Sequence, residues 1–350
     1  MAGTWDSQNK VLPGAYLNIK TNKPLSIMPG DRGTVVILQE MTVGDDGAMY
    51  TITATEAAWP EKATAEDKKL AVEALKKAKT VLVYKLPTGH DTEAVNAALT
   101  KLKTVQFNTL CYPFDGSTPA TATANKTAIA TWIKAMRDDE GVKCQAVLAN
   151  HVADDEGVIN VVHGVVLTDG TTLTAAETTA WVAGATAGAS ITTSNTGMKY
   201  VGAIDVEPRM TKTEMENAVK AGKFIFKVDT AQNVTAVYDI NSLTTVTVDK
   251  GKMFTKNRVI RTIDNIANDV TTIFESSYVG KVNNNDEGRS LLKASLVDYF
   301  VTLQNMSAIQ NFEPDDVTVV AGADIDAVVV DAYIQPVDSI EKIYITVHLS

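Results

Sequence analysis

Residues that commonly carry catalysis are sparse in this 350-residue chain. It has four histidines and two cysteines, and Cys111 and Cys144 lie in apolar, strand-like segments where a buried, reduced thiol is typical. His151 stands near three acids in the stretch HVADDEG. That spacing matches neither an EF-hand loop nor an HExxH helix, so we interpret the stretch as a turn and predict no metal site.

Motifs for phosphate binding and acyl transfer are missing from the sequence. It contains no GxxxxGK[ST], no GxGxxG and no GxSxG nucleophile elbow. The glycines of GATAGAS (184–190) have a spacing that lets another element pack closely against a helix. Acidic pairs at 45–46, 138–139 and 315–316 adjoin Gly or Pro and indicate turns. We therefore predict no catalytic residue, no cofactor and no enzyme activity. The weaker alternative is an α/β enzyme with a convergent nucleophile and base.

Composition restricts the partners that the chain can have. Hydrophobic residues make up 45 % and charged residues 21 %, as in a globular protein, and the formal net charge is −10. An acidic surface argues against nucleic acid and anionic membranes. No apolar run approaches the roughly 20 residues of a membrane span. The N-terminus lacks the pattern of a secretion signal, so we expect synthesis and folding in a cytoplasm, with no membrane insertion.

Hydrophobic periodicity predicts alternating strands and helices in the first two thirds of the chain. The predicted strands cover 33–41, 48–55, 80–86, 105–112, 142–149 and 158–167. The predicted helices begin at Thr64 and Asp91, cover 124–138 and about 174–187, and begin again at the Thr211-x-x-Glu214 capping box. A hairpin is predicted at 223–229 and 234–240. This alternation is typical of an α/β layer.

The last third has a different pattern. Val259, Ile263, Ile266, Val270 and Ile273 recur at spacings of four and three, which predicts a long amphipathic helix. A loop and a second helix follow, with this apolar stripe: Leu292, Leu296, Tyr299, Phe300 and Leu303. Strands over 326–336 and 341–350 complete the chain. The predicted fold class is therefore mixed α+β and α/β in several domains.

Both ends of the chain contain an isolated strand pattern. Apolar and polar residues alternate along 343–349 and again along 15–20. A lone strand exposes unpaired N–H and C=O groups and can join the sheet of another molecule, although either strand could instead fold back into its own domain. The candidate intersubunit residues are Ala15, Tyr16, Leu17, Ile19, Ile343, Ile345, Val347 and Leu349.

Several long stretches resemble one family. Residues 251–312, from GKMFTKNRVIRTIDNIANDV to LLKASLVDYFVTLQNMSAIQNF, closely resemble the C-terminal domain of contractile tail sheath proteins. The ending DAVVVDAYIQPVDSIEKIYITVHL resembles that family's closing strands, and LPGAYLNI its N-terminal arm. DDEGVINVVHGVVL and TAWVAGATAGAS resemble its central domain. The resemblance covers nearly the whole chain and is nearest to sheaths of PBSX-like prophages, clostridial myophages and R-type bacteriocins.

This resemblance implies a structural subunit. Such subunits form hexameric rings stacked helically around an inner tube, and contraction drives the tube through a bacterial envelope without nucleotide hydrolysis. The implied partners are further copies of the chain, the tube, the baseplate and the tail terminator. The implied location is a virion tail or bacteriocin particle assembled in the host cytoplasm. A passive strand-exchange filament or tube subunit is the alternative.

The resemblance also implies a domain plan. It comprises an N-terminal arm (1–24), an N-terminal α+β domain (25–90) and an outer central α/β domain (91–245). A tube-proximal C-terminal domain (246–338) of two long helices and a small β-sheet follows, then a C-terminal arm (339–350). Arms of neighbouring subunits would complete that small sheet.

Charge distribution suggests which surfaces meet. Residues 8–24 carry three lysines and no acid, whereas Lys342 is the one base in the acidic stretch 294–350. We predict that the N-terminal arm, through Lys20 and Lys23, docks beside acids of a neighbour, and the candidates are Asp331, Asp338 and Glu341. Lys281 and Arg289 flank the NNNDEG loop between the two long helices and are the predicted tube contacts.

Overall fold

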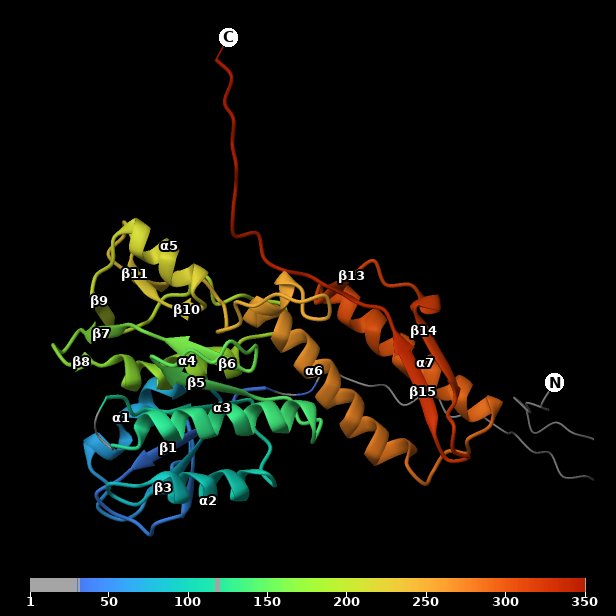
Figure 1. Ribbon diagram of the computed structural model, residues 1–350, viewed down its shortest axis with the longest axis horizontal. Coiled ribbons are helices and arrows are strands. Elements are labelled where there is room, and N and C mark those ends of the chain that lie inside the picture. Colours follow the sequence, from blue (N-terminus) through green and yellow to red (C-terminus); the bar gives the residue numbers. More distant parts are fainter. Residues whose placement is uncertain (1–29, 31, 117–119, 350) are drawn as a thin grey trace, which may run out of the picture.

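The computed structural model describes residues 30, 32–116 and 120–349 (Figure 1). Its larger part is built on a seven-stranded sheet in the order β10-β6-β5-β4-β1-β3-β2. All neighbouring strands in this sheet are parallel except β2, which runs antiparallel to β3 at one edge. The strands are β1 (Thr34–Glu40), β2 (Met49–Thr53), β3 (Thr80–Leu86), β4 (Thr109–Tyr112), β5 (Gln145–Ala149), β6 (Val158–Val161) and β10 (Lys223–Phe224).

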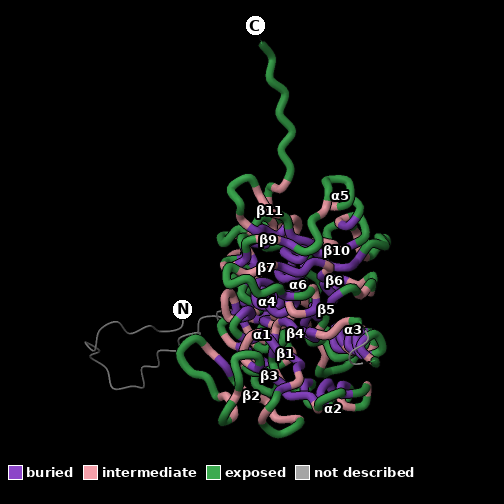
Figure 2. Tube along the Cα trace, turned by 90° about the vertical axis from the view of Figure 1, so that its left-hand side faces the viewer, coloured by how far each residue is buried: buried purple, intermediate pink, exposed green. Residues whose placement is uncertain are grey.

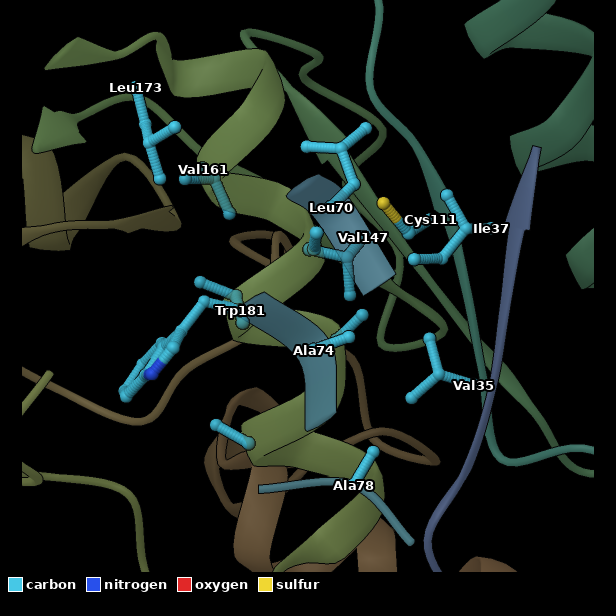
Figure 3. Close-up of a cluster of buried hydrophobic side chains, with 14 of the residues drawn as sticks. Val35, Ile37, Leu70, Ala74, Ala78, Cys111, Val147, Val161, Leu173 and Trp181 are labelled. Carbon is cyan, nitrogen blue, oxygen red and sulfur yellow. The ribbon is translucent and has the colours of Figure 1, made fainter. Parts of the chain in front are cut away.

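Helices cover both faces of this sheet because successive strand residues point to opposite sides. Val35 and Ile37 of β1 belong to a core that includes α1 (Ala65–Leu75) and α4 (Ala175–Gly188), as Figure 3 shows. Val36 and Leu38 belong to a second core with α2 (Thr92–Leu102) and α3 (Ala122–Asp138). Cys111 and Cys144 are both buried and free, one in each core, which agrees with the predicted reduced thiols.

Local capping signals in the sequence place the helix starts correctly. The Thr64 side chain accepts from the Asp67 amide and Asp91 accepts from the Ala94 amide, at the two predicted starts. Thr211 and Glu214 form the predicted capping box of α5 (Lys212–Lys220). These bonds satisfy amide groups that a helix leaves without an internal partner.

The glycines of GATAGAS bring two helices into close contact. A Cβ added to Gly184 would stand 2.2 Å from the carbonyl oxygen of Ala74, and one added to Gly188 would stand 2.0 Å from that of Lys77. Real side chains do not approach a backbone oxygen so closely. The close packing that the spacing predicted is therefore confirmed, and the element packed against α4 is α1.

We expect Gly184→Ala to destabilise the fold. The added methyl group must separate α1 from α4, and overpacking of this kind costs about 1–3 kcal/mol or more. Denaturant unfolding should show a lower midpoint with an unchanged slope. Gly251→Ala is the control, since nothing lies within 4 Å of a Cβ there and no positive φ is recorded. Equal midpoints for the two variants would contradict this packing.

Two predicted strands divide between different sheets. The segment predicted as one strand over 158–167 forms β6 in the large sheet and then β7 (Gly164–Leu167) in a three-stranded sheet. The partners of β7 there are β8 (Thr172–Leu173) and β9 (Ala203–Glu207). The observed hairpin is shorter than the one predicted at 223–229 and 234–240. The start of its first predicted strand, β10, joins the large sheet, and only β11 (Phe226–Val228) pairs with β12 (Val234–Ala236). Residues on both sides of each division are buried, so hydrophobicity alone gives no sign of the change of sheet.

The C-terminal part contains the two predicted long helices, α6 (Asn257–Ile273) and α7 (Asp286–Asn305). A 3-10 turn (Lys252–Thr255) precedes α6, and a π-helical turn (Phe274–Tyr278) follows it. The predicted apolar stripe of α7 is buried in a third core, together with Val317 of the hairpin β14 (Val317–Ala321) and β15 (Val328–Ala332). A 3-10 turn (Pro314–Asp316) precedes this hairpin, and a short pair joins β13 (Ile309–Gln310) to β16 (Gln335–Pro336).

The predicted fold class is thus confirmed: a central domain with a mostly parallel sheet is followed by a helical domain with small sheets. Residues 34–86 contribute three strands to the same sheet as residues 109–224, so the boundary predicted between 90 and 91 falls inside one layered unit. No helix among the described residues is long and apolar enough to cross a membrane.

Candidate functional site

The terminal segment, residues 342–349, extends away from the body of the subunit (Figure 1) and forms no strand with any other described residue. Its predicted interface side chains are exposed: Ile343 74 %, Ile345 78 %, Val347 74 % and Leu349 95 %. Figure 2 shows the contrast with the buried interior of the sheet layers. The alternating strand pattern is therefore present, but its partner is not found in the described part of this chain.

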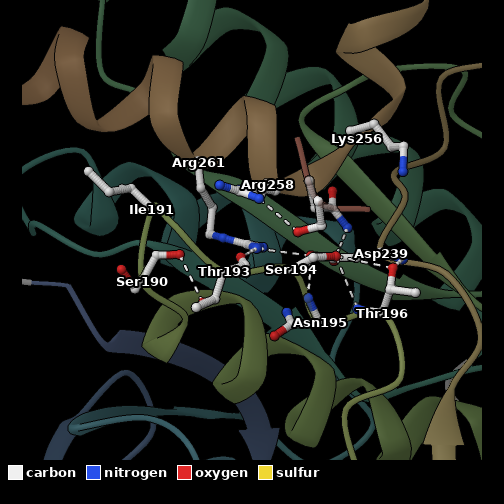
Figure 4. A network of polar contacts seen from close by, with 12 residues as sticks. Ser190, Ile191, Thr193, Ser194, Asn195, Thr196, Asp239, Lys256, Arg258 and Arg261 are labelled. Atoms are coloured by element: carbon white, nitrogen blue, oxygen red, sulfur yellow. Dashed lines mark hydrogen bonds and ion pairs between the residues drawn. The ribbon is translucent and has the colours of Figure 1, made fainter. Parts of the chain in front are cut away.

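Just before the terminal segment, the chain is held firmly by a group of polar side chains, which we call the arm-root cluster. Its members are Glu341, Asp338, Lys256, Ser194 and Thr196. The Glu341 carboxylate accepts from Ser194 Oγ at 3.0 Å and from Thr196 Oγ1 at 2.5 Å, and it forms an ion pair with Lys256. Lys256 also lies 3.3 Å from Asp338. The cluster thus joins the central domain, the start of α6 and the root of the C-terminal arm. Figure 4 shows Ser194, Thr196 and Lys256 of this cluster.

Electrostatics favours the charged form of Lys256 in the arm-root cluster. Burial disfavours the ammonium group of Lys256, but its bonds to Glu341 and Tyr238 and the nearby carboxylates outweigh this and raise its pKa. The Lys256 Nζ also stands 3.9 Å from the centroid of the Tyr238 ring. Next to this group, Arg258 Nη1 donates to Ser339 Oγ at 2.7 Å. The root of the arm is consequently bonded at both 339 and 341.

These contacts affect the predicted arm charge pairing. Asp338 and Glu341 already bind Lys256 of their own chain, whereas Asp331 lies exposed on β15. Lys20 and Lys23 fall outside the described residues, as do the N-terminal strand residues Ala15, Tyr16, Leu17 and Ile19. Of the three predicted acceptors, the side chain of Glu341 is buried against Lys256, Asp338 is exposed but pairs with Lys256, and Asp331 is exposed without an ion pair among the described residues.

The β14–β15 hairpin has the features of an acceptor for a further strand. It is a two-stranded sheet that packs on α7, and no third described strand pairs with either edge. Val320, Val329 and Val330 are 52 %, 48 % and 40 % exposed, and Tyr333 is 73 % exposed. Open edges with apolar side chains favour pairing with another chain.

Buried ion pairs hold α6 against the central domain. Arg137 of α3 donates to both carboxylate oxygens of Asp264, at 2.7 and 2.8 Å, and the two side chains are 6 % and 5 % exposed. Burial opposes the charge of Arg137, but Asp264 outweighs it and raises the pKa of the guanidinium. A second pair joins Arg261 Nη2 to Asp239 at 2.9 Å, with both side chains fully or almost fully buried. The structure thus reveals interdomain contacts that the sequence did not predict.

The predicted tube-facing residues lie at the loop between α6 and α7. Lys281 is exposed and its Nζ donates to the carbonyl of Ser276. Arg289 donates to Asn284 at 2.8 Å and pairs with Asp286, and its side chain is only 19 % exposed. Arg289 is therefore partly committed to holding this loop, and Lys281 is the more accessible of the two.

The acids near His151 have structural partners. Asp154 accepts from the amides and hydroxyls of Thr244 and Thr245, which lowers its pKa. Glu156 pairs with Lys250 at 2.6 Å. Among the described residues, no group of His, Cys, Asp or Glu has the arrangement of a metal site.

Comparisons with known proteins bear on this arrangement. The phage tail sheath protein central domain matches residues 88–242, and the phage tail sheath C-terminal domain matches residues 249–350. The phage-like element PBSX protein XkdK of Bacillus subtilis is 35 % identical over 278 residues, which cover 76 % of this chain and 59 % of that protein. The tail sheath protein of Clostridium phage phiCD119 is 33 % identical, over 62 % of this chain and 58 % of its own length.

The crystal structure of the sheath tail protein from Desulfitobacterium hafniense is similar over almost its whole length. It is 34 % identical with a TM-score of 0.81, and the match covers 95 % of this chain and 99 % of that one. The chain belongs to the phage tail sheath family. The resemblance seen in the sequence is thereby confirmed, and the family is one of structural, non-enzymatic proteins.

More distant sheaths share the fold. The helical sheath of the anti-feeding prophage in its contracted state is 14 % identical, with a TM-score of 0.74 over 97 % of this chain and all of that one. The chain spans between 57 % and 59 % of the length of the curated relatives that it matches. More than two fifths of each of those relatives therefore lies outside the region that matches this chain.

Proposed function

We propose that this protein is the subunit of a contractile tail sheath. It polymerises as stacked hexameric rings around an inner tube and contracts to drive the tube through a bacterial envelope. The observation that carries the proposal is the terminal segment 342–349, whose alternating apolar side chains are exposed and whose backbone has no partner strand in the described chain. A strand of this kind finds its sheet in another copy.

Strand exchange would link the copies. The terminal segment of one subunit and the N-terminal arm of another would add to the β14–β15 hairpin of a third, whose edges carry exposed valines. Backbone hydrogen bonds supply affinity in such a joint, and alternate side chains supply specificity. No cofactor takes part, and the energy of contraction is stored in the extended lattice.

The same proposal assigns partners and location. The sheath would contact further copies of itself, an inner tube, a baseplate and a tail terminator, in a phage tail or bacteriocin particle assembled in the host cytoplasm. The sheath relatives with contracted and baseplate structures support the homo-oligomer and the baseplate contact. The acidic net charge supports the absence of nucleic-acid contacts.

Negative-stain microscopy of the purified full chain tests the function. We expect tubes with a cogwheel cross-section. Thin fibres would favour a passive strand-exchange filament instead. Particles that stay dispersed at all protein and salt concentrations, together with a hydrolytic activity, would favour the α/β enzyme.

The charged N-terminal arm gives a prediction on assembly. The double reversal Lys20→Glu with Lys23→Glu should slow assembly and change its dependence on salt, because complementary charge accelerates encounter and selects register. Light scattering at several salt concentrations measures both effects. Asp331→Lys should produce the same defect and, combined with the double reversal, should restore part of the rate. Unchanged kinetics across salt would disprove this pairing.

The α6–α7 loop gives a prediction on the tube. Lys281→Glu should weaken the association of sheath with tube and leave polymers of the sheath alone intact, since Lys281 is exposed and its loss leaves no buried partner. Cosedimentation with purified tube measures the difference. A structure of the tube-bound, extended sheath that places Lys281 and Arg289 on the outer surface would refute the contact.

A further inference from the structure

We infer that the arm-root cluster sets the direction in which the terminal segment leaves the subunit, and so presents it to one particular neighbour. The inference rests on the proposed function, because it assigns a positioning role within the same strand-exchange joint. The side chains of the cluster come from the central domain, from Lys256 just before α6 and from the arm root, and do not themselves enter a neighbour's sheet.

The exposure of successive side chains shows where the chain stops being held by the arm-root cluster. The side chain of Glu341 is 6 % exposed, whereas Ile343 is 74 % and Tyr344 90 % exposed. One carboxylate oxygen of Glu341 accepts from Ser194 and Thr196, and the other pairs with Lys256. The carboxylate is thus satisfied on both oxygens within the subunit. Lys342 Nζ still lies 5.8 Å from the centroid of the Tyr238 ring, and the exposed apolar side chains of the terminal segment begin at Ile343.

The groups that hold Glu341 are themselves fixed. Thr196 Oγ1 accepts from the amide of Asp239 at 2.9 Å, and Asp239 accepts from the amide of Asn195 at 2.9 Å. Asp239 in turn pairs with the buried Arg261 of α6. The arm root is therefore attached where the central domain and α6 meet.

A fixed direction has a consequence for assembly. A flexible arm loses conformational freedom when it joins a neighbour's sheet, and orienting it beforehand removes part of that loss. Release of Glu341 should therefore slow assembly without changing the residues that enter the neighbour's sheet. A purely structural role of Glu341 would instead lower the stability of the subunit and leave the arm direction unchanged.

The test compares Glu341→Ala and Glu341→Gln with Glu61→Ala, an exposed acid for which the described chain shows no hydrogen bond or ion pair. Nitroxide labels on Thr346→Cys and Lys212→Cys report the distance between the terminal segment and α5. The native Cys111 and Cys144 are buried and should not be labelled. Distances are measured on the full chain at a protein concentration at which light scattering detects no polymer. Assembly is then followed at higher concentration. The melting temperature of each variant shows whether it is folded.

We expect a narrow distance distribution in the parent chain and in Glu61→Ala, a broad one in Glu341→Ala, and an intermediate one in Glu341→Gln. Assembly of Glu341→Ala should be slower by about tenfold, as loss of preorganisation predicts. If the distance distribution of Glu341→Ala is the same as that of the parent chain, the inference is wrong. It is also wrong if the distribution broadens but Glu341→Ala assembles at the normal rate. If the parent chain forms no polymer at all, the proposed function fails, while the distance distributions still decide whether Glu341 orients the arm.

Discussion

Ile345→Asp should leave a folded monomer and abolish polymers. Ile345 lies in the middle of the terminal segment and is 78 % exposed in the subunit, so the substitution removes almost no packing there. Surface substitutions of this kind usually change stability by about 0.5 kcal/mol or less. In a neighbour's sheet the same aspartate would be buried without a partner, which costs several kcal/mol or forces it to take up a proton.

Melting and negative-stain microscopy on one preparation measure both consequences. Thr346→Asp is the matched control, because the adjacent side chain points to the opposite face of the strand and should tolerate a charge better. We expect both variants to have melting temperatures close to that of the parent chain, and only Thr346→Asp to form tubes. A monomer that melts many degrees lower, or intact tubes built from Ile345→Asp, would mean that the terminal segment does not enter another subunit.

Features encoded within a few residues could be predicted from the sequence. The helix starts at Thr64, Asp91 and Thr211 were found because an N-cap side chain bonds to an amide three residues later. The two long helices of the C-terminal part followed from spacings of three and four, which any amphipathic helix must show. The close approach at Gly184 was visible as a spacing, but its partner α1 was not.

Contacts between distant residues could not be predicted. Lys256 pairs with Glu341 across 85 positions, and Arg137 pairs with Asp264 across 127. Nothing in the neighbourhood of either base distinguishes it from an exposed lysine or arginine. The distribution of charge along the sequence predicts acidic acceptors for the arm, but it does not show that Glu341 pairs with Lys256 of its own chain while Asp331 is exposed.

We expect the Arg137–Asp264 pair to contribute strongly to the stability of the contact between the central domain and the C-terminal helical domain. Arg137→Ala leaves the Asp264 carboxylate buried without its partner and also removes the donor to the carbonyl of Cys144. Breaking a buried pair from one side costs about 3–5 kcal/mol. Urea unfolding should therefore show a much lower midpoint. Lys134→Ala on the same helix is the control, and a 62 % exposed lysine should contribute only about 0–1 kcal/mol.

A second variant separates the charge effect from the packing effect. Arg137→Met combined with Asp264→Leu replaces both members of the pair by apolar groups, so neither is left as a buried charge without the other, and it should recover most of the stability that Arg137→Ala loses. If the double variant is as unstable as the single one, the bidentate geometry itself holds α3 to α6. If Arg137→Ala is no less stable than Lys134→Ala, the two domains are held together by other contacts, and the Arg261–Asp239 pair becomes the next one to remove. In the expected case, the joint from which the arm root emerges depends on buried charges that each have a partner within the subunit, whereas the exposed terminal segment is left to pair with another one.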